Sequence, residues 1–227
     1  MLESTKENIP DMDRLAGVID GCDIIVVRSC TEYEAEWFRL IKDLHRKPVI
    51  LVRVLPPKPE EKFKDTDACL STKKWTRRGP WDTKPLELLE GFEERTAERG
   101  IVWRGWVEQL RTLNHDSIGL VLTHCGWSTM IEAVRFAKPM VMQGFVLDQG
   151  FNARVAEEKK VGHMIPRDEA TCFFTKEDVS KSLRLVMEGE EGKVYRENVK
   201  DMKGVFGDMD TQDLYVDSFL DYLVAHR

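Results

Sequence analysis

The sequence predicts an α/β protein with a doubly wound, Rossmann-like parallel sheet, and three observations lead to this fold class. Short apolar runs that suit buried strands alternate with segments of helical periodicity. The connections between these elements are short, as in α/β folds. The composition, 42% hydrophobic and 33% charged, is that of a globular domain.

The beginning of the chain predicts a strand, a helix and a second strand. Residues 23–28 and 47–53 are apolar runs suited to buried strands. Between them, Thr31 is the predicted N-cap of a helix, and Glu34 completes a capping box. The apolar face of that helix comprises Trp37, Leu40, Ile41 and Leu44. The order strand, helix, strand implies that the two strands run parallel.

The middle of the chain separates two regular regions. Residues 55–61 hold three prolines followed by charges, a composition typical of a linker. Residues 62–85 have almost no periodic apolar signal and are predicted to be a loop. We therefore expect a first domain at residues 1–54, a linker and irregular segment at 55–85, and a second domain at 86–227.

Strands and helices alternate again in the second domain. The predicted strands are 100–103, 119–123, 139–142 and 162–166. The predicted helices are 86–90, 107–113, 129–136, 149–159, 176–187, 193–205 and 210–225. This order is typical of a doubly wound domain, in which ligands bind beyond the carboxyl ends of the strands.

Charge and cysteine usage narrow the class of protein. A formal net charge of −6 argues against a nucleic-acid partner, because phosphate backbones demand clustered Lys and Arg. Five cysteines without a CxxC pair fit the reduced thiols of a cytoplasmic protein better than a disulfide framework or a zinc site. No signal peptide is visible, and no apolar run approaches the roughly 20 residues of a membrane span. No GxGxxG follows a strand, which argues against a nicotinamide-dependent enzyme.

The turn between the strand at 119–123 and the next helix carries the predicted chemistry. Gly126 lets the backbone approach an anion, and the N-terminus of the helix favours a phosphate. His124, Ser128 and Thr129 add side-chain donors around the same turn. Taken singly, Ser128 and Thr129 are also explained as plain N-caps, and His124 as a hydrogen-bonded strand end.

Three further side chains stand where hydroxyl groups of a ligand are expected. Glu132 lies one turn into the helix, where a carboxylate suits the paired hydroxyls of a ribose. Asp148 and Gln149 follow the next strand and suit the hydroxyls of a sugar. Taken singly, Asp148 is also explained as a helix cap, and Trp106 and Trp127 as core aromatics. Together these residues predict a crevice that holds a diphosphate, a ribose and a sugar.

The spacing of these residues resembles the signature of the plant family 1 UDP-glycosyltransferases. The match runs without insertion or gap and includes Trp106, Val107, Gln109, Leu113, His115, His124, Cys125, Gly126, Trp127, Glu132, Pro139, Asp148 and Gln149. The resemblance implies a GT-B fold, in which a C-terminal Rossmann-like domain holds the UDP-sugar and an N-terminal one holds the acceptor. Residues 22–30, 47–57, 133–139, 148–160 and 202–208 further resemble the branch named UDP-rhamnose:rhamnosyltransferase, which extends sugar chains on glycosides.

The resemblance assigns a role to each residue of the signature. The implied UDP ligands are Trp106 on the uracil, Val107 at its edge, Gln109 near the ribose, Glu132 on the ribose hydroxyls, and His124, Gly126, Trp127, Ser128 and Thr129 around the diphosphate. The implied ligands of the donor sugar are Asp148 and Gln149. The resemblance implies that no metal or cofactor takes part. Ser128 and Thr129 stand where the family has Asn and Ser, and Ser128 is the shorter side chain.

The resemblance also implies what the sequence lacks. The family's catalytic base, a histidine paired with an aspartate, belongs to the start of the N-terminal domain, so no catalytic residue is assigned. Residues 62–85 stand where the family has a strand, a Gly-Ser turn, a helix and another strand. We therefore expect a truncated member in which 1–54 is the end of the acceptor domain and 86–227 is the UDP-sugar-binding domain.

The expected reaction is the transfer of rhamnose, glucose or xylose from a UDP-sugar to a hydroxyl of a plant secondary metabolite or its glycoside, with inversion. The expected partners are the UDP-sugar and a small-molecule glycoside acceptor, and the protein is expected to be a cytoplasmic monomer. The alternative is a catalytically inactive remnant that still binds UDP.

Overall fold

The computed structural model describes most of the chain as two compact units. The described residues are 11–56, 88, 90–100, 102, 107–146, 148–168 and 170–226. The larger unit comprises Met1–Pro56 together with Gly119–Arg227, and the smaller unit comprises Pro57–Ile118. In the smaller unit the structure describes two helices, α4 (Phe92–Thr96) and α5 (Gln109–Asn114). The loop, helix and strand predicted before residue 104 fall largely outside the described residues.

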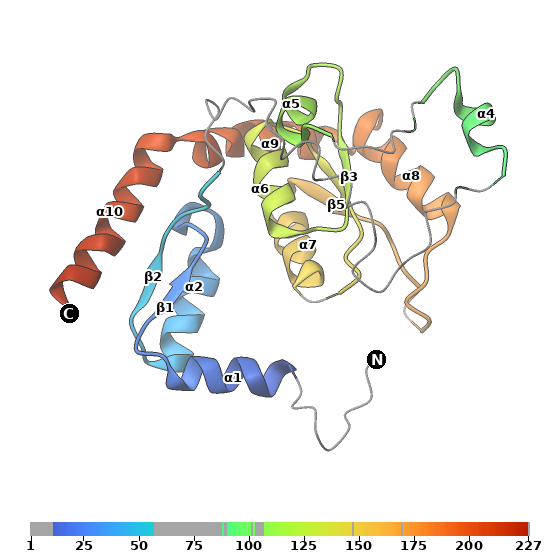
Figure 1. The fold of residues 1–227 in the computed structure, drawn as a ribbon. Coiled ribbons are helices and arrows are strands. Elements are labelled where there is room, and N and C mark those ends of the chain that lie inside the picture. Colours follow the sequence, from blue (N-terminus) through green and yellow to red (C-terminus); the bar gives the residue numbers. More distant parts are fainter. Residues whose placement is uncertain are drawn as a thin grey trace, which may run out of the picture. The chain divides into compact units, whose positions relative to one another are not determined.

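Three parallel strands form the central sheet of the larger unit (Figure 1). They are β3 (Val121–Thr123), β4 (Met140–Met142) and β5 (Gly162–Met164), in the order β3-β4-β5. All three residues of β4 are buried, as expected for a strand between two others in a sheet that helices cover. The predicted α/β class with parallel strands is therefore confirmed.

Five helices connect or follow these strands. They are α6 (Trp127–Arg135), α7 (Gln149–Glu158), α8 (Lys176–Met187), α9 (Lys193–Gly207) and α10 (Met209–Ala225). Helix α7 packs against β5, α8 packs against β4 and β5, and α6 packs against α9. All five were predicted, with bounds that differ by at most a few residues.

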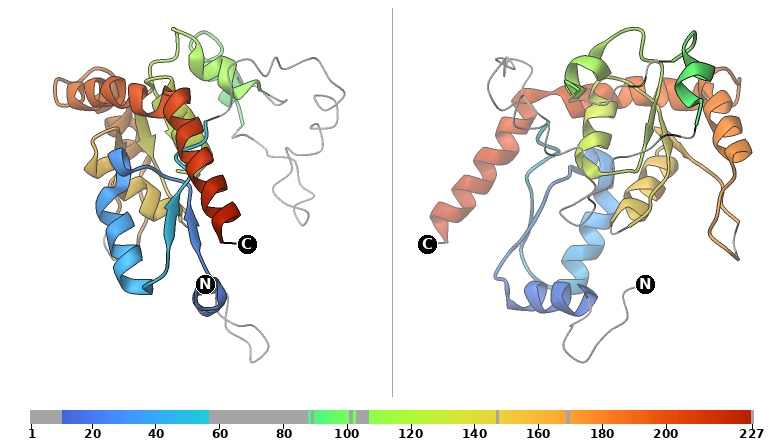
Figure 2. Two further views of the ribbon diagram at one scale, coloured as in Figure 1. Left: turned by 90° about the vertical axis from the view of Figure 1, so that its left-hand side faces the viewer. Right: turned by 45° about the vertical axis from the view of Figure 1, so that its right-hand side comes forward.

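The N-terminal segment forms the predicted strand–helix–strand unit. Strand β1 (Ile25–Val27) pairs in parallel with β2 (Val49–Leu51), and α2 (Thr31–His45) connects them. Helix α10 packs against β2, which Figure 2 shows from two sides. A further helix, α1 (Asp11–Gly21), precedes β1 and was missed.

Two details predicted for α2 are wrong. The N-cap is Cys30 rather than Thr31, and no side chain closes a capping box. Glu34 instead accepts a hydrogen bond from the Ser29 hydroxyl, and its own backbone has the non-helical φ of −134°. The apolar face also stays open, because Trp37 and Leu44 are 49% and 69% exposed.

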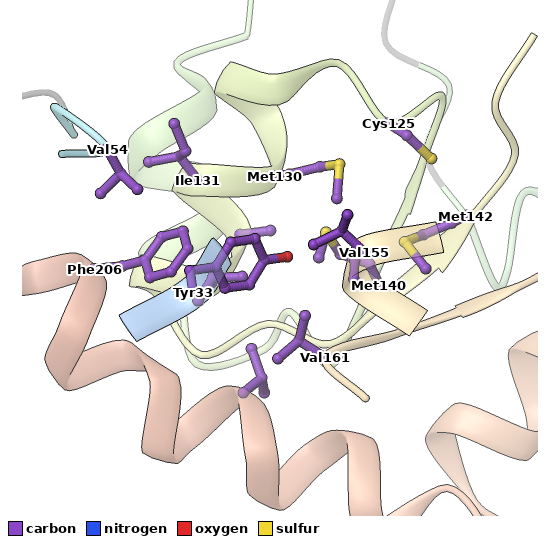
Figure 3. Packing of buried hydrophobic residues seen from close by; sticks show 14 of the residues in the cluster. Tyr33, Val54, Cys125, Met130, Ile131, Met140, Met142, Val155, Val161 and Phe206 are labelled. Carbon is purple, nitrogen blue, oxygen red and sulfur yellow. The ribbon is translucent and has the colours of Figure 1, made fainter. Parts of the chain in front are cut away.

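The core of the larger unit is shared by the N-terminal and C-terminal segments. Figure 3 shows the Tyr33 ring of α2 beside Phe206 of α9 and among side chains of the central sheet. The Tyr33 ring meets Phe206 edge-on at 5.2 Å between centroids, and it lies 5.9 Å from Trp127. Because one cluster of buried side chains contains residues from both segments, we expect them to fold together.

Candidate functional site

The turn after β3 is fixed on both sides by side chains. Cys125 has a left-handed backbone conformation, with φ of 69°, which is uncommon for a residue with a side chain. The Thr123 hydroxyl accepts a hydrogen bond from the Cys125 N–H at 3.1 Å. The Asn152 side chain, from α7, donates to the Cys125 carbonyl at 3.1 Å. These two bonds hold the strained residue in place and orient the start of α6.

Gly126 is the N-cap of α6, and its missing side chain leaves room for His124. A Cβ atom at Gly126 would lie only 2.8 Å from Nε2 of His124. As a glycine, the N-cap residue has no side chain of its own to cap the helix. The N-terminus of α6 therefore has the partial positive charge and the backbone donors that suit an anion, with an exposed imidazole beside it.

Trp127 and Ser128 begin α6, and both contact Arg28, which directly follows β1. The indole N–H of Trp127 donates to the Arg28 carbonyl at 2.9 Å. The Arg28 guanidinium donates from Nη1 to the Ser128 hydroxyl oxygen at 3.1 Å. The Trp127 side chain is thus held toward the core and Arg28, while Ser128 is exposed. Sequence reasoning missed Arg28.

Thr129 and Glu132 continue the same helix. Both side chains are half-buried. Glu132 follows Ser128 by four positions, so the two lie on one face of α6, about one turn apart. This arrangement matches the predicted order of diphosphate and ribose ligands along the helix.

The predicted sugar ligands follow β4, the strand that pairs with β3 in the sheet. Asp148 is exposed, and its carboxylate accepts a hydrogen bond from the Asn152 amide at 3.0 Å. Gln149 uses its side-chain oxygen to accept from the backbone N–H groups of Phe145 and Val146, at 2.9 and 3.2 Å. Since that oxygen is engaged, the Gln149 side chain can serve a sugar mainly as a donor, through its NH₂ group.

The predicted uracil ligands belong to the smaller unit. Trp106 lies outside the described residues. Val107 is 43% exposed, and Gln109 is the first residue of α5 and also exposed. The structure therefore brings together the predicted ligands of the diphosphate, the ribose and the sugar at the carboxyl ends of β3 and β4.

Among the described residues, no group of three or more His, Cys, Asp or Glu side chains could hold a metal ion. None of the helices described in the structure combines the length and the apolar character that a membrane crossing requires.

Comparison with known proteins gives concordant matches. Residues 84–227 match the family model described as UDP-glucoronosyl and UDP-glucosyl transferase. UDP-glycosyltransferase 91A1 of Arabidopsis thaliana is 63% identical, in an alignment that covers 100% of this chain and 58% of the relative. Soyasaponin III rhamnosyltransferase of Glycine max is 33% identical over 91% of this chain and 53% of the relative.

The length of the alignment shows a difference within the matched region. The chain spans a little over half the length of these curated relatives. The alignment with the Arabidopsis protein nevertheless runs over 271 residues, about 44 more than the 227 residues of this chain. The relative therefore carries residues in the matched region that have no counterpart here.

A solved structure links the sequence match to the fold. UDP-glucose:anthocyanidin 3-O-glucosyltransferase, solved in complex with UDP, aligns with a TM-score of 0.66 and 27% identity. The alignment covers 87% of this chain and 51% of that protein. The match of the family model, the sequence relatives and the parallel α/β sheet agree, and they show that the chain belongs to the UDP-glycosyltransferase family with the GT-B fold.

Proposed function

We propose that the larger part of this chain is the donor-binding domain of an inverting UDP-glycosyltransferase. It would bind a UDP-sugar, and the sugar would pass to a hydroxyl of a plant secondary metabolite or its glycoside. The observation that carries this proposal is the start of α6, where Gly126 caps the helix and His124 and Ser128 lie beside its N-terminus.

The proposed roles follow from the chemistry of the groups at this site. The N-terminus of α6, with Ser128 and Thr129, would hold the diphosphate, and Glu132 would accept hydrogen bonds from the ribose hydroxyls. Asp148 and Gln149 would hold the donor sugar, the former by accepting and the latter by donating.

The same helix would assist the reaction as well as binding. When the acceptor hydroxyl attacks the anomeric carbon from the opposite side, the bond to the β-phosphate oxygen breaks and UDP leaves with added negative charge. A helix N-terminus that already points at this oxygen stabilises the charge without reorganisation. We assign no residue of this chain as the base that takes the acceptor's proton.

A second candidate function is the binding of UDP without transfer. One finding favours it: about 44 residues of the Arabidopsis protein, inside the matched region, have no counterpart in this chain. The donor sugar also stays a proposal. Rhamnose fits the soyasaponin III rhamnosyltransferase match, glucose fits the anthocyanidin glucosyltransferase match, and xylose is the third candidate.

Two measurements separate these functions. Isothermal titration calorimetry with UDP measures binding, and the Trp106→Ala variant, which removes the proposed uracil platform, is expected to bind much more weakly. Incubation with labelled UDP-rhamnose, UDP-glucose or UDP-xylose and glycoside acceptors measures transfer. Binding with transfer supports the enzyme, binding without transfer supports the second function, and no heat at millimolar UDP contradicts both.

A further inference from the structure

Arg28 links three segments of the larger unit that are far apart in sequence. Its Nε donates to the Val54 carbonyl at 2.9 Å, and its Nη2 donates to the Leu55 carbonyl at 3.1 Å. Its Nη1 donates to the Ser128 hydroxyl oxygen at 3.1 Å. Val54 itself lies in the shared core beside Ile131 of α6 (Figure 3). Two consecutive backbone carbonyls in the segment after β2 therefore hold the planar guanidinium beside α6.

The hydrogen bond to Ser128 has a defined direction. A guanidinium has five donors and no acceptor, so the Ser128 oxygen must be the acceptor in this contact. The hydroxyl proton of Ser128 is then left to point elsewhere, and no acceptor for it is recorded among the described residues. Arg28 thus presets Ser128 as a donor at the N-terminus of α6, which is the role that a phosphate oxygen needs.

The charge of Arg28 acts in the same sense. All three of its recorded acceptors are uncharged oxygens, namely two carbonyls and one hydroxyl. These contacts therefore do not neutralise the positive charge of Arg28. The charged group is hydrogen-bonded to Ser128, which is the residue predicted to bind the phosphates. A cation in this place adds to the field of the α6 N-terminus.

Arg28 also offers a physical reason for Ser128 in a position where the family signature has Asn. An Asn amide donates through its own NH₂ group whatever its oxygen contacts. A serine hydroxyl rotates, and a group that donates to its oxygen favours the orientations in which its proton points away from that group; Arg28 is such a group.

We propose that Arg28 is a positioning residue of the diphosphate site, acting through the orientation of the Ser128 hydroxyl and through its charge. This inference rests on the proposed UDP-binding function. It predicts that Arg28 matters for the phosphates of the ligand and not for the nucleoside.

The test compares UDP with uridine, both titrated by NMR, which reaches millimolar dissociation constants. Arg28→Met is expected to weaken UDP binding about tenfold, as for the loss of one charged hydrogen bond, and to leave uridine binding unchanged. Arg28→Lys keeps a charge and a donor and is expected to recover most of the UDP affinity. Arg39→Met removes the same charge from the exposed surface of α2 and is the matched control, with wild-type binding expected.

A double variant tests whether Arg28 acts through Ser128. In a Ser128→Ala background, Arg28→Met is expected to have a smaller effect on UDP affinity than in the wild type. The proposal is overturned if Arg28→Met binds UDP as the wild type does, or if it loses UDP and uridine binding alike, as a purely structural role requires. The first of these results leaves the proposed function standing. A wild-type chain that does not bind UDP at all would overturn the proposed function as well.

Discussion

The substitution Gly126→Ala tests the geometry of the α6 N-terminus most sharply. Gly126 has φ of −63° and ψ of 130°, a conformation that alanine adopts without backbone strain. Its new Cβ would lie 2.8 Å from His124 Nε2, so the imidazole must move. The His124 ring is exposed and can turn away, and we therefore expect the free energy of unfolding to change by less than about 1 kcal/mol.

The effect on UDP binding is expected to be much larger. The added methyl group would stand where we propose that the diphosphate approaches the backbone, and the displaced imidazole would no longer reach it. The loss of one charge-assisted hydrogen bond corresponds to about 1.5–3 kcal/mol, or a ten- to hundredfold weaker dissociation constant. Calorimetry with UDP measures this change, and urea denaturation measures stability.

Gly204→Ala is the matched control for this experiment. Gly204 lies in α9, and apart from its own stretch of helix no atom of the described residues lies within 4 Å of a Cβ built there. Alanine there is expected to raise the free energy of unfolding by about 0.5–1 kcal/mol and to leave UDP affinity unchanged. Wild-type UDP affinity in Gly126→Ala would refute the reasoning, because the diphosphate would then not need the space at this residue.

Three further predictions concern the loop after β4, the core and the thiols. Gly144→Ala places a Cβ 2.9 Å from backbone atoms of the residues that begin α7, and urea denaturation should show a loss of about 1–3 kcal/mol; wild-type stability would contradict this. Tyr33→Ala empties the centre of the shared core and should cost about 3–5 kcal/mol in the same assay, whereas a loss below about 1 kcal/mol would mean that the core does not depend on it. Burial raises the pKa of Cys30 to about 12 and that of Cys125 to about 11. Alkylation at about pH 8, followed by peptide mass mapping, should therefore modify the exposed Cys172 before these two thiols. Equal rates at all three would rule out this burial.

Much of the fold could be predicted from the sequence because its signals are local. The bounds predicted for α8 agree with the structure, and Thr175 and Asp178 form a capping box at its start. At α2 the same kind of signal gave a wrong prediction, because the Glu34 carboxylate accepts a hydrogen bond from the Ser29 hydroxyl and closes no capping box. Helix α1 was missed although Leu15, Val18 and Ile19 have helical spacing, because these three positions cover little more than one turn and are a weak signal on their own.

In the candidate site, too, local sequence patterns predict some residues, whereas others depend on the folded structure. Gly126 and Ser128 could be predicted as phosphate ligands because a strand-to-helix turn is a local pattern with a known preference for phosphates. Arg28 was missed because it lies 100 positions before Ser128, and no spacing rule connects the end of β1 with the start of α6. The engagement of the Gln149 oxygen by the loop before it was also beyond sequence reasoning, since it depends on the path of the backbone at Phe145.

A titration of the ¹⁵N-labelled chain with UDP, followed by two-dimensional NMR, tests the central claim most directly. The claim is that the N-terminus of α6 holds the diphosphate. We predict that the backbone amide signals of Gly126, Trp127, Ser128 and Thr129 shift most as UDP is added, and that they shift less with uridine. Unchanged amide signals in this turn at saturating UDP would contradict the account, whatever the measured affinity.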